Sequence, residues 1–551
     1  MTYLALKPTA RFVRGPRRSA LYDLPGKRIF PLDAWSTTLL AEALEGRGLE
    51  EILESVGVPA GKARRLVFEA LAGHPLLRVS PGKPAEAALQ AGPSGIPNEP
   101  SPAPAQTPPG PAVPSLRRLP MAPPAAVARH RRLEFLWLEL TERCNLRCVH
   151  CYAGSGPGLE DGPMGTQEHL RILRQAAQAG CRRVQFNGGE ATLHAGFQRL
   201  VQEAVALGYE RIEVYTNATQ FNDERVSFLR EHGVRVAVSF YSHREKVHES
   251  ITRVPGSFRR TVAAIKALLA AGVPVRVGLI RMRPNQDDVP ATLDFLAALG
   301  VAPDAVGMDD VRPAGRGCGD SLVPSGGRAR LLTPPTGTHM SSGADGELGC
   351  STCWSGKVAV APSGDVFPCI FSRELPAGNV LRSGLAEVLE GETLQDLWSI
   401  DKAQIPVCRD CEFRYGCFDC RALAFKQTRE LRSKPPSCAY DPYTGTWGEP
   451  GEGGEGAALP EGGAVPVRAR GLRWARAGEV ALLYSAASQA LVTINRVAAE
   501  VWRLCDGRRS LHGIARRLSR RYRVPEAEVT RDVRALAREL AGLGLVELRA
   551  A

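Results

Sequence analysis

Three cysteines within eight residues constrain the fold of this chain more than any other feature. Their spacing is Cys-x3-Cys-x2-Cys, with thiols at Cys144, Cys148 and Cys151. Thiolates on one short loop can hold an iron–sulfur cluster, which prefers four ligands, so one iron would lack a protein ligand. A zinc ion would need a fourth Cys or His nearby, and His150 would have to fold back onto its own loop. The spacing therefore favours a cluster over a zinc site or a chance group of buried cysteines.

The residues around this loop predict where it lies in the fold. The segment Leu133–Leu140 alternates apolar and polar residues and then becomes apolar, which is typical of a strand. The loop therefore follows the C-terminal end of a strand, where β/α barrels carry their sites. Gly188, Gly189 and Glu190 follow the next strand candidate, Val184–Phe186. A glycine pair lets the backbone approach a ligand closely. A Gly-Gly-Glu segment alone is weak evidence, but its position after the strand that follows the cysteine loop makes it a strong signal.

The two motifs together resemble the radical S-adenosylmethionine (SAM) superfamily. The resemblance implies that the three cysteines hold a 4Fe–4S cluster, whose open iron takes the amino and carboxylate groups of SAM. It implies that the Gly-Gly-Glu segment holds the methionine amine, and that other contacts lie near the ends of the third to fifth strands. The expected contacts are Thr216, Asn217, Ser239 and Arg253. Arg259 and Arg260 are alternatives to Arg253, and each of these residues could instead cap a helix or form a turn.

Strand and helix signals alternate from residue 130 to 325. Amphipathic helices at Thr166–Ala179, Gly196–Leu207 and Phe258–Ala270 separate the strand candidates. These candidates are Leu133–Leu140, Val184–Phe186, Arg211–Tyr215, Arg235–Phe240, Val275–Ile280 and Ala305–Met308. Six βα units predict an α/β fold with a partial (β/α)6 barrel, shorter than the eight-unit form.

A second cysteine-rich segment spans residues 345–443. Its eight cysteines are Cys350, Cys353, Cys369, Cys408, Cys411, Cys417, Cys420 and Cys438. Eight thiols are enough for two four-ligand clusters, and two zinc sites would use the same number. After a barrel of this kind, the segment resembles the SPASM domain, which carries two auxiliary 4Fe–4S clusters. The pair Cys417 and Cys420 departs from the family pattern, because two residues separate them where the family usually has three.

The resemblance also implies interleaved ligand sets. The cluster nearer the barrel is expected to use Cys350, Cys353, Cys369 and Cys420. The outer cluster is expected to use Cys408, Cys411, Cys417 and Cys438. Outside these sets, Cys181 and Cys505 are typical of small buried side chains, whereas Cys318 lies near the expected barrel mouth and is a candidate for chemistry.

Two similar segments flank these domains. Residues 1–80 combine short strands with three helices, as in a winged helix, and residues 465–551 repeat this plan. In the second segment, Ile494–Trp502 and Cys505–Gly507 resemble PqqD-like peptide-recognition elements, whereas the first segment matches by pattern only. The segments between domains are expected linkers, Pro/Ala-rich at 81–129 and Gly/Glu-rich at 444–464.

The C-terminal segment is strongly basic. Residues 465–551 contain 17 Arg and 8 Asp or Glu, which gives +9 of the net charge of +12. An exposed strand edge in basic surroundings can pair with an extended acidic leader peptide. Basic helices could instead contact DNA phosphates or remain a solvated surface. Fusion to an enzyme of a peptide-modifying type favours the leader peptide.

The resemblance implies an oxidoreductase that crosslinks a ribosomally made precursor peptide through a 5′-deoxyadenosyl radical. A thioether is the leading product and a carbon–carbon link the next. The implied cofactors are SAM and three 4Fe–4S clusters, and the implied partners are a leader peptide and a reductant such as a ferredoxin or flavodoxin. The leader is expected on residues 465–551, with residues 1–80 as the alternative. Other hypotheses are radical modification of a folded protein residue or cofactor precursor and, more remotely, a DNA-binding iron–sulfur sensor.

The remaining features concern the compartment. No apolar run reaches the ~18 residues that a membrane span needs, and the N-terminus lacks the layout of a signal peptide. Fourteen cysteines without an export signal favour metal binding over disulfides. The sequence therefore predicts a cytoplasmic protein with no membrane contact, and nucleic acid is not the expected partner.

Overall fold

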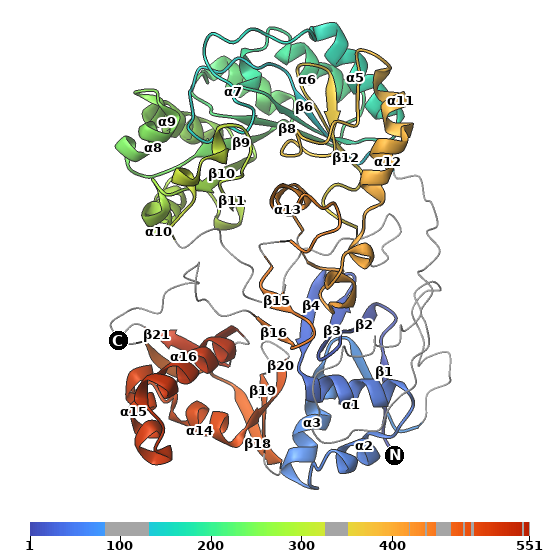
Figure 1. Ribbon diagram of the computed structural model, residues 1–551, viewed down its shortest axis with the longest axis vertical. Helices are drawn as coiled ribbons and strands as arrows, with labels where there is room; N and C mark the ends of the chain where they lie inside the picture. Colours follow the sequence, from blue (N-terminus) through green and yellow to red (C-terminus); the bar gives the residue numbers. More distant parts are fainter. Residues whose placement is uncertain are drawn as a thin grey trace.

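The computed structural model describes residues 1–82, 132–325, 351–417, 419–435, 438–447, 464–477, 480–485, 490–542 and 545–549. Most of both predicted linkers lies outside these ranges. The barrel lies at the top of Figure 1, the cysteine-rich segment below it, and the two terminal modules side by side at the bottom. Among the helices in the described ranges, none has the length and apolar character that crossing a membrane requires.

Six parallel strands form the barrel wall and follow one another in chain order. They are β6 (Phe135–Glu139), β7 (Arg183–Asn187), β8 (Arg211–Thr216), β9 (Arg235–Phe240), β10 (Val275–Arg281) and β11 (Val306–Asp310). The connecting helices are α5 (Thr166–Gln178), α6 (Phe197–Ala206), α7 (Asp223–Glu231), α8 (Glu245–Thr252), α9 (Ser257–Ala270) and α10 (Val289–Ala298). Helix residues Leu170, Leu200 and Ile265 share one buried core with strand residues Val214 and Val236. The predicted alternation of strands and helices, and the α/β class, are confirmed.

The cysteine-rich segment extends the same sheet. Strand β12 (Lys357–Val360) runs parallel to β6, and β13 (Asp365–Phe367) and β14 (Gly378–Asn379) add antiparallel strands beyond it. The segment continues with α11 (Gly384–Glu390), α12 (Glu392–Ser399), α13 (Arg421–Thr428), β15 (Tyr440–Asp441) and β16 (Thr446–Trp447). The sequence predicts a separate domain here, but its first three strands belong to the nine-stranded barrel sheet.

The two terminal modules have the same order of elements. The N-terminal module contains β1 (Tyr3–Leu6), β2 (Ala10–Arg14), β3 (Ser19–Asp23), β4 (Arg28–Leu32), α1 (Ala34–Leu44), α2 (Leu49–Ser55), α3 (Lys62–Gly73) and β5 (Leu77–Ser80). The C-terminal module contains β17 (Val465–Arg468), β18 (Leu472–Ala477), β19 (Val480–Ser485), β20 (Ala490–Asn495), α14 (Arg496–Leu504), α15 (Leu511–Tyr522), α16 (Glu526–Gly542) and β21 (Val546–Arg549). In each module the first and last strands pair, and the three middle strands form an antiparallel sheet.

Four of these strands, β1, β2, β17 and β18, have no counterpart in the sequence prediction. Strand β18 buries only Ala475 and Ala477, so no run of large apolar residues marks it. Strands β1 and β17 pair with the last strand of their modules. Such distant pairing leaves no local signal in the sequence.

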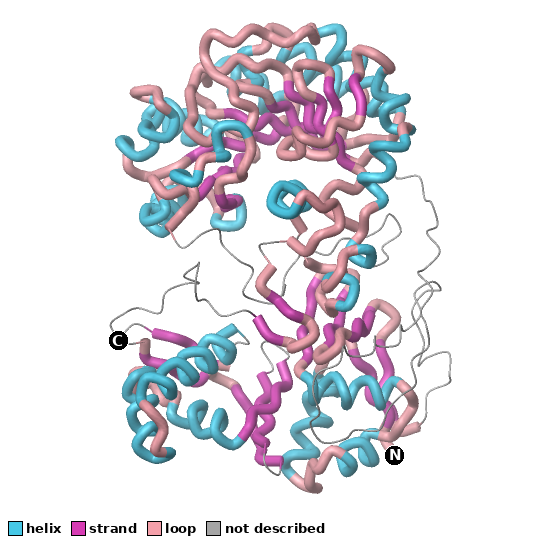
Figure 2. Tube along the Cα trace, in the orientation of Figure 1, coloured by secondary structure: helices cyan, strands magenta, loops and turns pink. Residues whose placement is uncertain are grey.

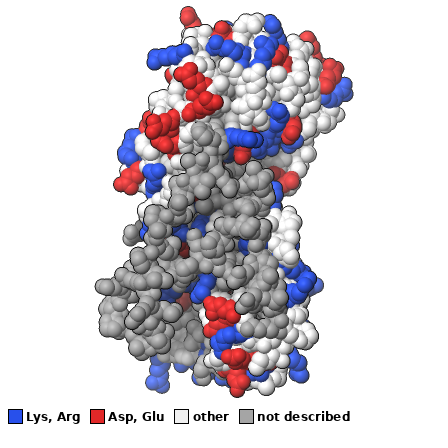
Figure 3. Space-filling view, turned by 90° about the vertical axis from the view of Figure 1, so that its right-hand side faces the viewer, with Lys and Arg blue, Asp and Glu red and all other residues white. Residues whose placement is uncertain are grey.

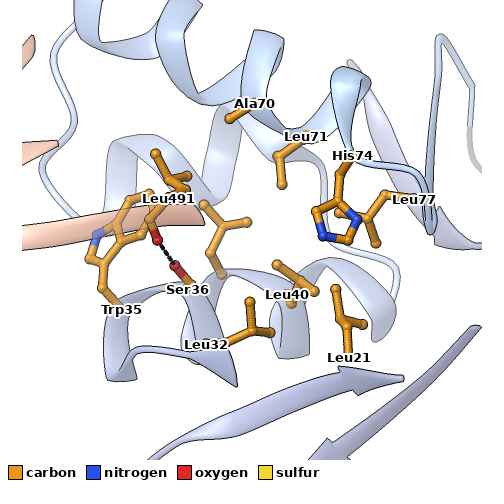
Figure 4. Close-up of a pocket in the computed structure, with 11 residues that line it drawn as sticks. Leu21, Leu32, Trp35, Ser36, Leu40, Ala70, Leu71, His74, Leu77 and Leu491 are labelled. Carbon is orange, nitrogen blue, oxygen red and sulfur yellow. Dashed lines mark hydrogen bonds between the residues drawn. The ribbon is translucent and has the colours of Figure 1, made fainter. Parts of the chain in front are cut away.

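The N-terminal module contacts two neighbours: it lies below the cysteine-rich segment and beside the C-terminal module in Figure 2. Residues Tyr22 and Ile29 on one face of its sheet pack against Phe413 and Tyr440 of the cysteine-rich segment. On the other side, helices α1 and α3 pack against β18–β20 of the C-terminal module, and the two modules share one apolar core. Figure 4 shows Leu491 of β20 among residues of the N-terminal module in this core.

Candidate functional site

The cysteines of the first motif lie on the loop that leaves β6, and all three are free thiols. Burial raises the pKa of Cys144 and of Cys148 to about 12, and the nearby Cys151 thiol raises both further. The loop is fastened to the barrel by a backbone bond from Val149 N to Ile251 O at 2.9 Å. One buried and two partly buried free thiols on one loop are a donor set that suits a metal cluster, because the metal stabilises their thiolate form.

The imidazole ring of the neighbouring His150 is neither charged nor exposed. Its imidazole packs edge-on against Tyr241, with ring centroids 4.9 Å apart. Burial lowers the pKa of His150 to about 4, so the ring is neutral at physiological pH.

The glycine pair lies directly against the cysteine loop. The Gly189 N–H donates to Thr141 O at 2.7 Å, and the Glu190 N–H donates to Arg143 O at 2.8 Å. A Cβ atom on Gly189 would lie 2.1 Å from Arg143 O, and Gly188 has φ +147°. Glycine is therefore required here so that two backbones can approach closely. The sequence predicted a ligand contact at these residues but not this contact with the cysteine loop.

The Glu190 side chain joins the ends of two strands. It is buried, and its carboxylate accepts from Thr216 Oγ1 at 2.7 Å and from Asn217 N at 2.8 Å. It also accepts from Thr192 Oγ1 at 2.6 Å. Glu190 thus fixes the Thr216–Asn217 corner, which follows β8, relative to the cysteine loop.

Asn217 connects this corner to the first thiol. Its Nδ2 donates to Cys144 Sγ at 3.8 Å and to Asn145 Oδ1 at 2.9 Å, while its Oδ1 accepts from Thr219. The sequence proposed Asn217 as a SAM contact, and the structure brings it together with Glu190 and Cys144.

The other expected SAM contacts lie in two different places. The Ser239 hydroxyl on β9 bonds to the buried hydroxyls of Tyr215 and Tyr241 inside the barrel. Arg253 is an exposed residue in the left-handed conformation at the end of α8. Of the alternatives, Arg259 pairs with Glu245, and the Arg260 side chain donates to a nearby backbone carbonyl.

Arg316 holds the backbone of the cysteine loop, a contact that the sequence did not predict. Its guanidinium donates to the carbonyl oxygens of Cys148 at 2.9 Å, Gly154 at 2.6 Å and Ser155 at 2.7 Å. The preceding Gly315 has φ +53°, and a Cβ atom there would lie 2.4 Å from Cys151 O. The local sequence signal for this contact is only a Gly-Arg pair after the last strand of the barrel.

The cysteines of the second motif gather in two groups. One contains Cys353, Cys369 and Cys420, whose thiols interact electrostatically, and burial raises the pKa of each. The other contains Cys408, Cys411, Cys417 and Cys438, in which the first three interact with Cys438 in the same way. Cys350, which the interleaved pattern assigns to the first group, lies outside the described residues.

A barrel arginine reaches the first of these groups. Arg312, which follows β11, donates from Nη1 to Cys420 Sγ at 2.7 Å. Its guanidinium also pairs with Asp309 and lies 5.6 Å from the Phe371 ring centroid. By contrast, Cys318 is exposed, and Cys181 and Cys505 are buried, as expected for the last two.

Three protein-family models match the sequence. The model of the Radical SAM superfamily matches residues 138–296. The model of the iron–sulfur cluster-binding SPASM domain matches residues 350–412, and that of coenzyme PQQ synthesis protein D matches residues 479–546.

This chain aligns with several named proteins over most of their length. The AdoMet-dependent heme synthase of Methanosarcina barkeri is 26% identical over 338 residues, 55% of this chain and 95% of that protein. A PqqA peptide cyclase of Gluconobacter oxydans is 25% identical over 339 residues, 56% and 91% of the two chains. The mycofactocin maturase of Mycobacterium ulcerans is 30% identical over 273 residues, 45% and 71% of the two chains. The chain belongs to the radical SAM superfamily.

Radical SAM and SPASM domains imply SAM and 4Fe–4S clusters as cofactors. Among the described residues, no three Cys, His, Asp or Glu side chains lie close enough to hold a single metal ion. The free motif thiols are nevertheless the ligand type that iron–sulfur clusters use, and the backbone around the first loop is held by Arg316 and Gly189. A buried ion pair further links the first loop of the radical SAM domain to the SPASM segment. Arg373 pairs with Glu139, which also accepts from the Tyr152 hydroxyl at 3.1 Å.

Proposed function

We propose that this chain is a radical SAM maturase that crosslinks a ribosomally synthesised precursor peptide. The observation that carries the proposal is the fusion of a braced three-thiol loop and two further thiol groups to a basic module that matches the PQQ synthesis protein D model. A relative named as a peptide cyclase, which aligns along 91% of its length, supports a peptide substrate.

The proposed cofactor set is SAM with three 4Fe–4S clusters. The first cluster would use the thiols of the first loop, and the auxiliary clusters would use the two SPASM sets. When bound and reduced, this set supplies a 5′-deoxyadenosyl radical that removes hydrogen from a substrate carbon. A ferredoxin or flavodoxin is the proposed reductant and the cytoplasm the proposed compartment.

The chain's own residues have distinct roles in this proposal. Arg316 and Gly189 hold the backbone of the cysteine loop in one shape. Asn217 orients the Cys144 thiol, while Glu190 keeps Asn217 at the end of its strand. The SAM contacts proposed for Gly188, Thr216, Ser239 and Arg253 complete the site.

The bond formed distinguishes two versions of the proposal. A thioether is the leading product, since the auxiliary thiol groups could hold a cluster that binds a substrate thiolate or removes the second electron. A carbon–carbon link is the next. A cofactor precursor is the second candidate substrate, and the similarity to a heme synthase along 95% of its length favours it as the alternative.

The deciding experiment is anaerobic co-expression with a short peptide encoded beside this gene, followed by mass spectrometry. Loss of two hydrogens per link, with a cysteine that no longer alkylates, is the expected result. The same loss with all cysteines free would replace the thioether by a carbon–carbon link. An unmodified peptide together with active SAM cleavage would reject the peptide substrate.

Two variants control this experiment. Cys148→Ala should abolish SAM cleavage, because the cluster loses one of its three ligands. Deletion of residues 465–551 should leave SAM cleavage intact but remove peptide modification. Unchanged peptide modification after the deletion would contradict the role proposed for the C-terminal module.

A further inference from the structure

The SPASM segment contains a charged pair that is almost completely excluded from solvent. The side chains of Asp419 and Arg421 are 2% and 0% exposed. Arg421 Nε lies 2.9 Å from Asp419 Oδ1 and 2.7 Å from Asp419 Oδ2. Arg421 Nη1 donates to Leu431 O at 3.2 Å, whereas its Nη2 has no hydrogen-bond partner in the described part of the chain.

Stability alone does not explain this pair. Two buried charges lose more hydration energy than their attraction commonly returns, and an apolar pair of similar size is often as stable. The Arg421 Nη2 group, which no described residue satisfies, would also be available to the sulfur of a cluster. A buried pair of this kind therefore points to a role in the site.

The pair adjoins both thiol groups of the SPASM segment. Two residues, the second of them Asp419, separate Cys417 from Cys420 in the chain. Arg421 is the first residue of α13, and its N–H donates to Cys353 Sγ at 3.3 Å. We call the two sets of thiols the inner SPASM group (Cys353, Cys369 and Cys420) and the outer SPASM group (Cys408, Cys411, Cys417 and Cys438).

The two charges act unequally on the two groups. In the inner SPASM group, burial raises the pKa of Cys353, and the Asp419 carboxylate raises it further. In the outer SPASM group, burial raises the pKa of Cys408 to about 12 and that of Cys417 to about 11. Asp419 adds to both of these shifts, but the Arg421 guanidinium opposes them. The guanidinium thus offsets the carboxylate at the outer group.

Each group also has a cation from outside the pair. Arg312 of the barrel donates to Cys420 Sγ at 2.7 Å in the inner SPASM group. In the outer SPASM group, burial raises the pKa of Cys417, and the buried Lys402 opposes this shift. Since each group has such a cation, the Asp419–Arg421 pair is a source of difference between them.

A fixed charge beside a cluster changes its reduction potential, because the reduced cluster carries one more negative charge. Charges in the interior are screened less than charges in water, so the effect is larger there. The Asp419 carboxylate should therefore lower the potential of a cluster on the inner SPASM group. At the outer SPASM group, the Arg421 guanidinium should cancel this effect.

We propose that the buried Asp419–Arg421 pair lowers the reduction potential of the inner auxiliary centre relative to the outer one, so that an electron passes more readily from the inner to the outer centre. In this transfer the inner 4Fe–4S cluster is oxidised by one electron and the outer cluster is reduced by one electron. No proton moves and no covalent bond changes. The proposal rests on the proposed function, since it uses the two auxiliary clusters assigned there.

The test is a redox titration of the anaerobic full-length holoenzyme, followed by electron paramagnetic resonance. Cys438→Ala removes a ligand of the outer set and so identifies the outer signal. The double variant Asp419→Asn/Arg421→Gln removes both charges without leaving one of them unpaired in the interior. We expect the equilibrium constant for electron transfer from the inner to the outer centre to fall at least tenfold, which is a gap narrower by about 59 mV for one electron.

Two further variants make the test specific. Arg429→Gln removes an exposed arginine at the end of α13, which pairs with the exposed Glu374, and should leave the gap unchanged. Asp419→Asn alone keeps an oxygen for Arg421 Nε. It should raise the potential of the inner centre, and it provides the test if the double variant binds less iron than the wild type.

The remaining outcomes separate this proposal from the proposed function. An unchanged or wider gap in the double variant, an inner potential that Asp419→Asn does not raise, or an equal effect of Arg429→Gln would overturn the proposal. If mass spectrometry still detects a crosslinked peptide in that case, the proposed function stands. If the wild type gives neither two auxiliary signals nor a crosslinked peptide, both fail.

Discussion

Arg312 is a cation held against a cysteine of the inner SPASM group. Its guanidinium is mostly buried and donates to Cys420 Sγ at 2.7 Å, and interaction with Cys420 and Asp309 raises its pKa despite burial. Hydrogen bonds and positive charge near cluster sulfurs make reduction easier, because the reduced cluster is more negative. The shortened spacing before Cys420 is thus accompanied by a strong side-chain contact from the barrel.

We predict that Arg312→Gln lowers the reduction potential of the auxiliary centre nearer the barrel. A redox titration followed by electron paramagnetic resonance measures this potential directly. Arg382→Gln, which changes an exposed arginine of the same segment, should leave all potentials unchanged. A potential unaltered by Arg312→Gln would contradict the influence of this guanidinium on the cluster.

Gly189 allows the turn after β7 to lie against the cysteine loop. We predict that Gly189→Ala destabilises the apoprotein by about 1–3 kcal/mol, because the added Cβ lies 2.1 Å from Arg143 O and must displace backbone. Iron bound per chain should fall with it. Thermal unfolding and iron analysis provide the two measurements.

The matched control for this change is Gly156→Ala. Gly156 lies in the same loop region, but a Cβ atom there would meet only Leu146 O at 3.9 Å. Normal stability and iron content are expected for it. If both alanine variants lose iron equally, the close approach at Gly189 is not the cause.

Helix α8 places a histidine in an apolar layer beside β9. The His248 side chain is buried among the rings of Phe240, Tyr241 and Phe258. Burial lowers its pKa from 6.5 to about 4. The unfolded chain therefore binds a proton at a higher pH than the folded chain, so stability is present above pH 6.5 and is lost as pH falls toward 4.

We predict that His248→Phe removes this part of the acid sensitivity. Between pH 8 and pH 5, the wild type should lose about 2 kcal/mol more stability than the variant, from a pKa difference of about 2.5 at ~1.36 kcal/mol per pKa unit. Urea unfolding at the two pH values measures the difference. Parallel losses in both proteins would mean that His248 does not contribute.

At the scale of the whole molecule, the N-terminal module connects the outer SPASM group to the C-terminal module. Tyr22 is fully buried at the first contact, and its hydroxyl donates to the Glu412 carbonyl at 2.6 Å, beside Cys411. On the face shown in Figure 3, acidic and basic side chains are interspersed over the barrel. Apolar packing and buried hydrogen bonds join the N-terminal module to its neighbours.

We predict that Tyr22→Phe loosens this contact, since the Glu412 carbonyl loses a buried donor at a cost of about 1–3 kcal/mol. Hydrogen exchange should become faster in residues 408–417. Tyr209→Phe removes a comparable buried bond inside the barrel, from the hydroxyl to Leu173 O at 2.9 Å. It should leave residues 408–417 unchanged, and faster exchange in both variants would contradict a specific role for Tyr22.

Local patterns were enough to predict the chemistry of the site and the class of the fold. Cysteine spacing identified the thiols of the first loop, and the Gly-Gly-Glu segment identified its neighbour, because both signals are confined to a few adjacent residues. Strand and helix periodicity predicted the barrel elements, because burial of one face repeats at a fixed interval. The same local rules missed β18, whose buried residues are alanines.

Only the tertiary structure determined what surrounds these elements. Arg316 binds a carbonyl 168 positions away, and Asp33 binds an amide 460 positions away, so no local pattern contains either contact. The extension of the barrel sheet by β12 and the hydrogen bonds from Asp33 and Ser36 to β20 depend on how already formed elements pack together. Sequence patterns specify the secondary-structure elements and the types of ligand residue. Packing between distant parts of the chain determines which strand and which carbonyl oxygens these residues contact.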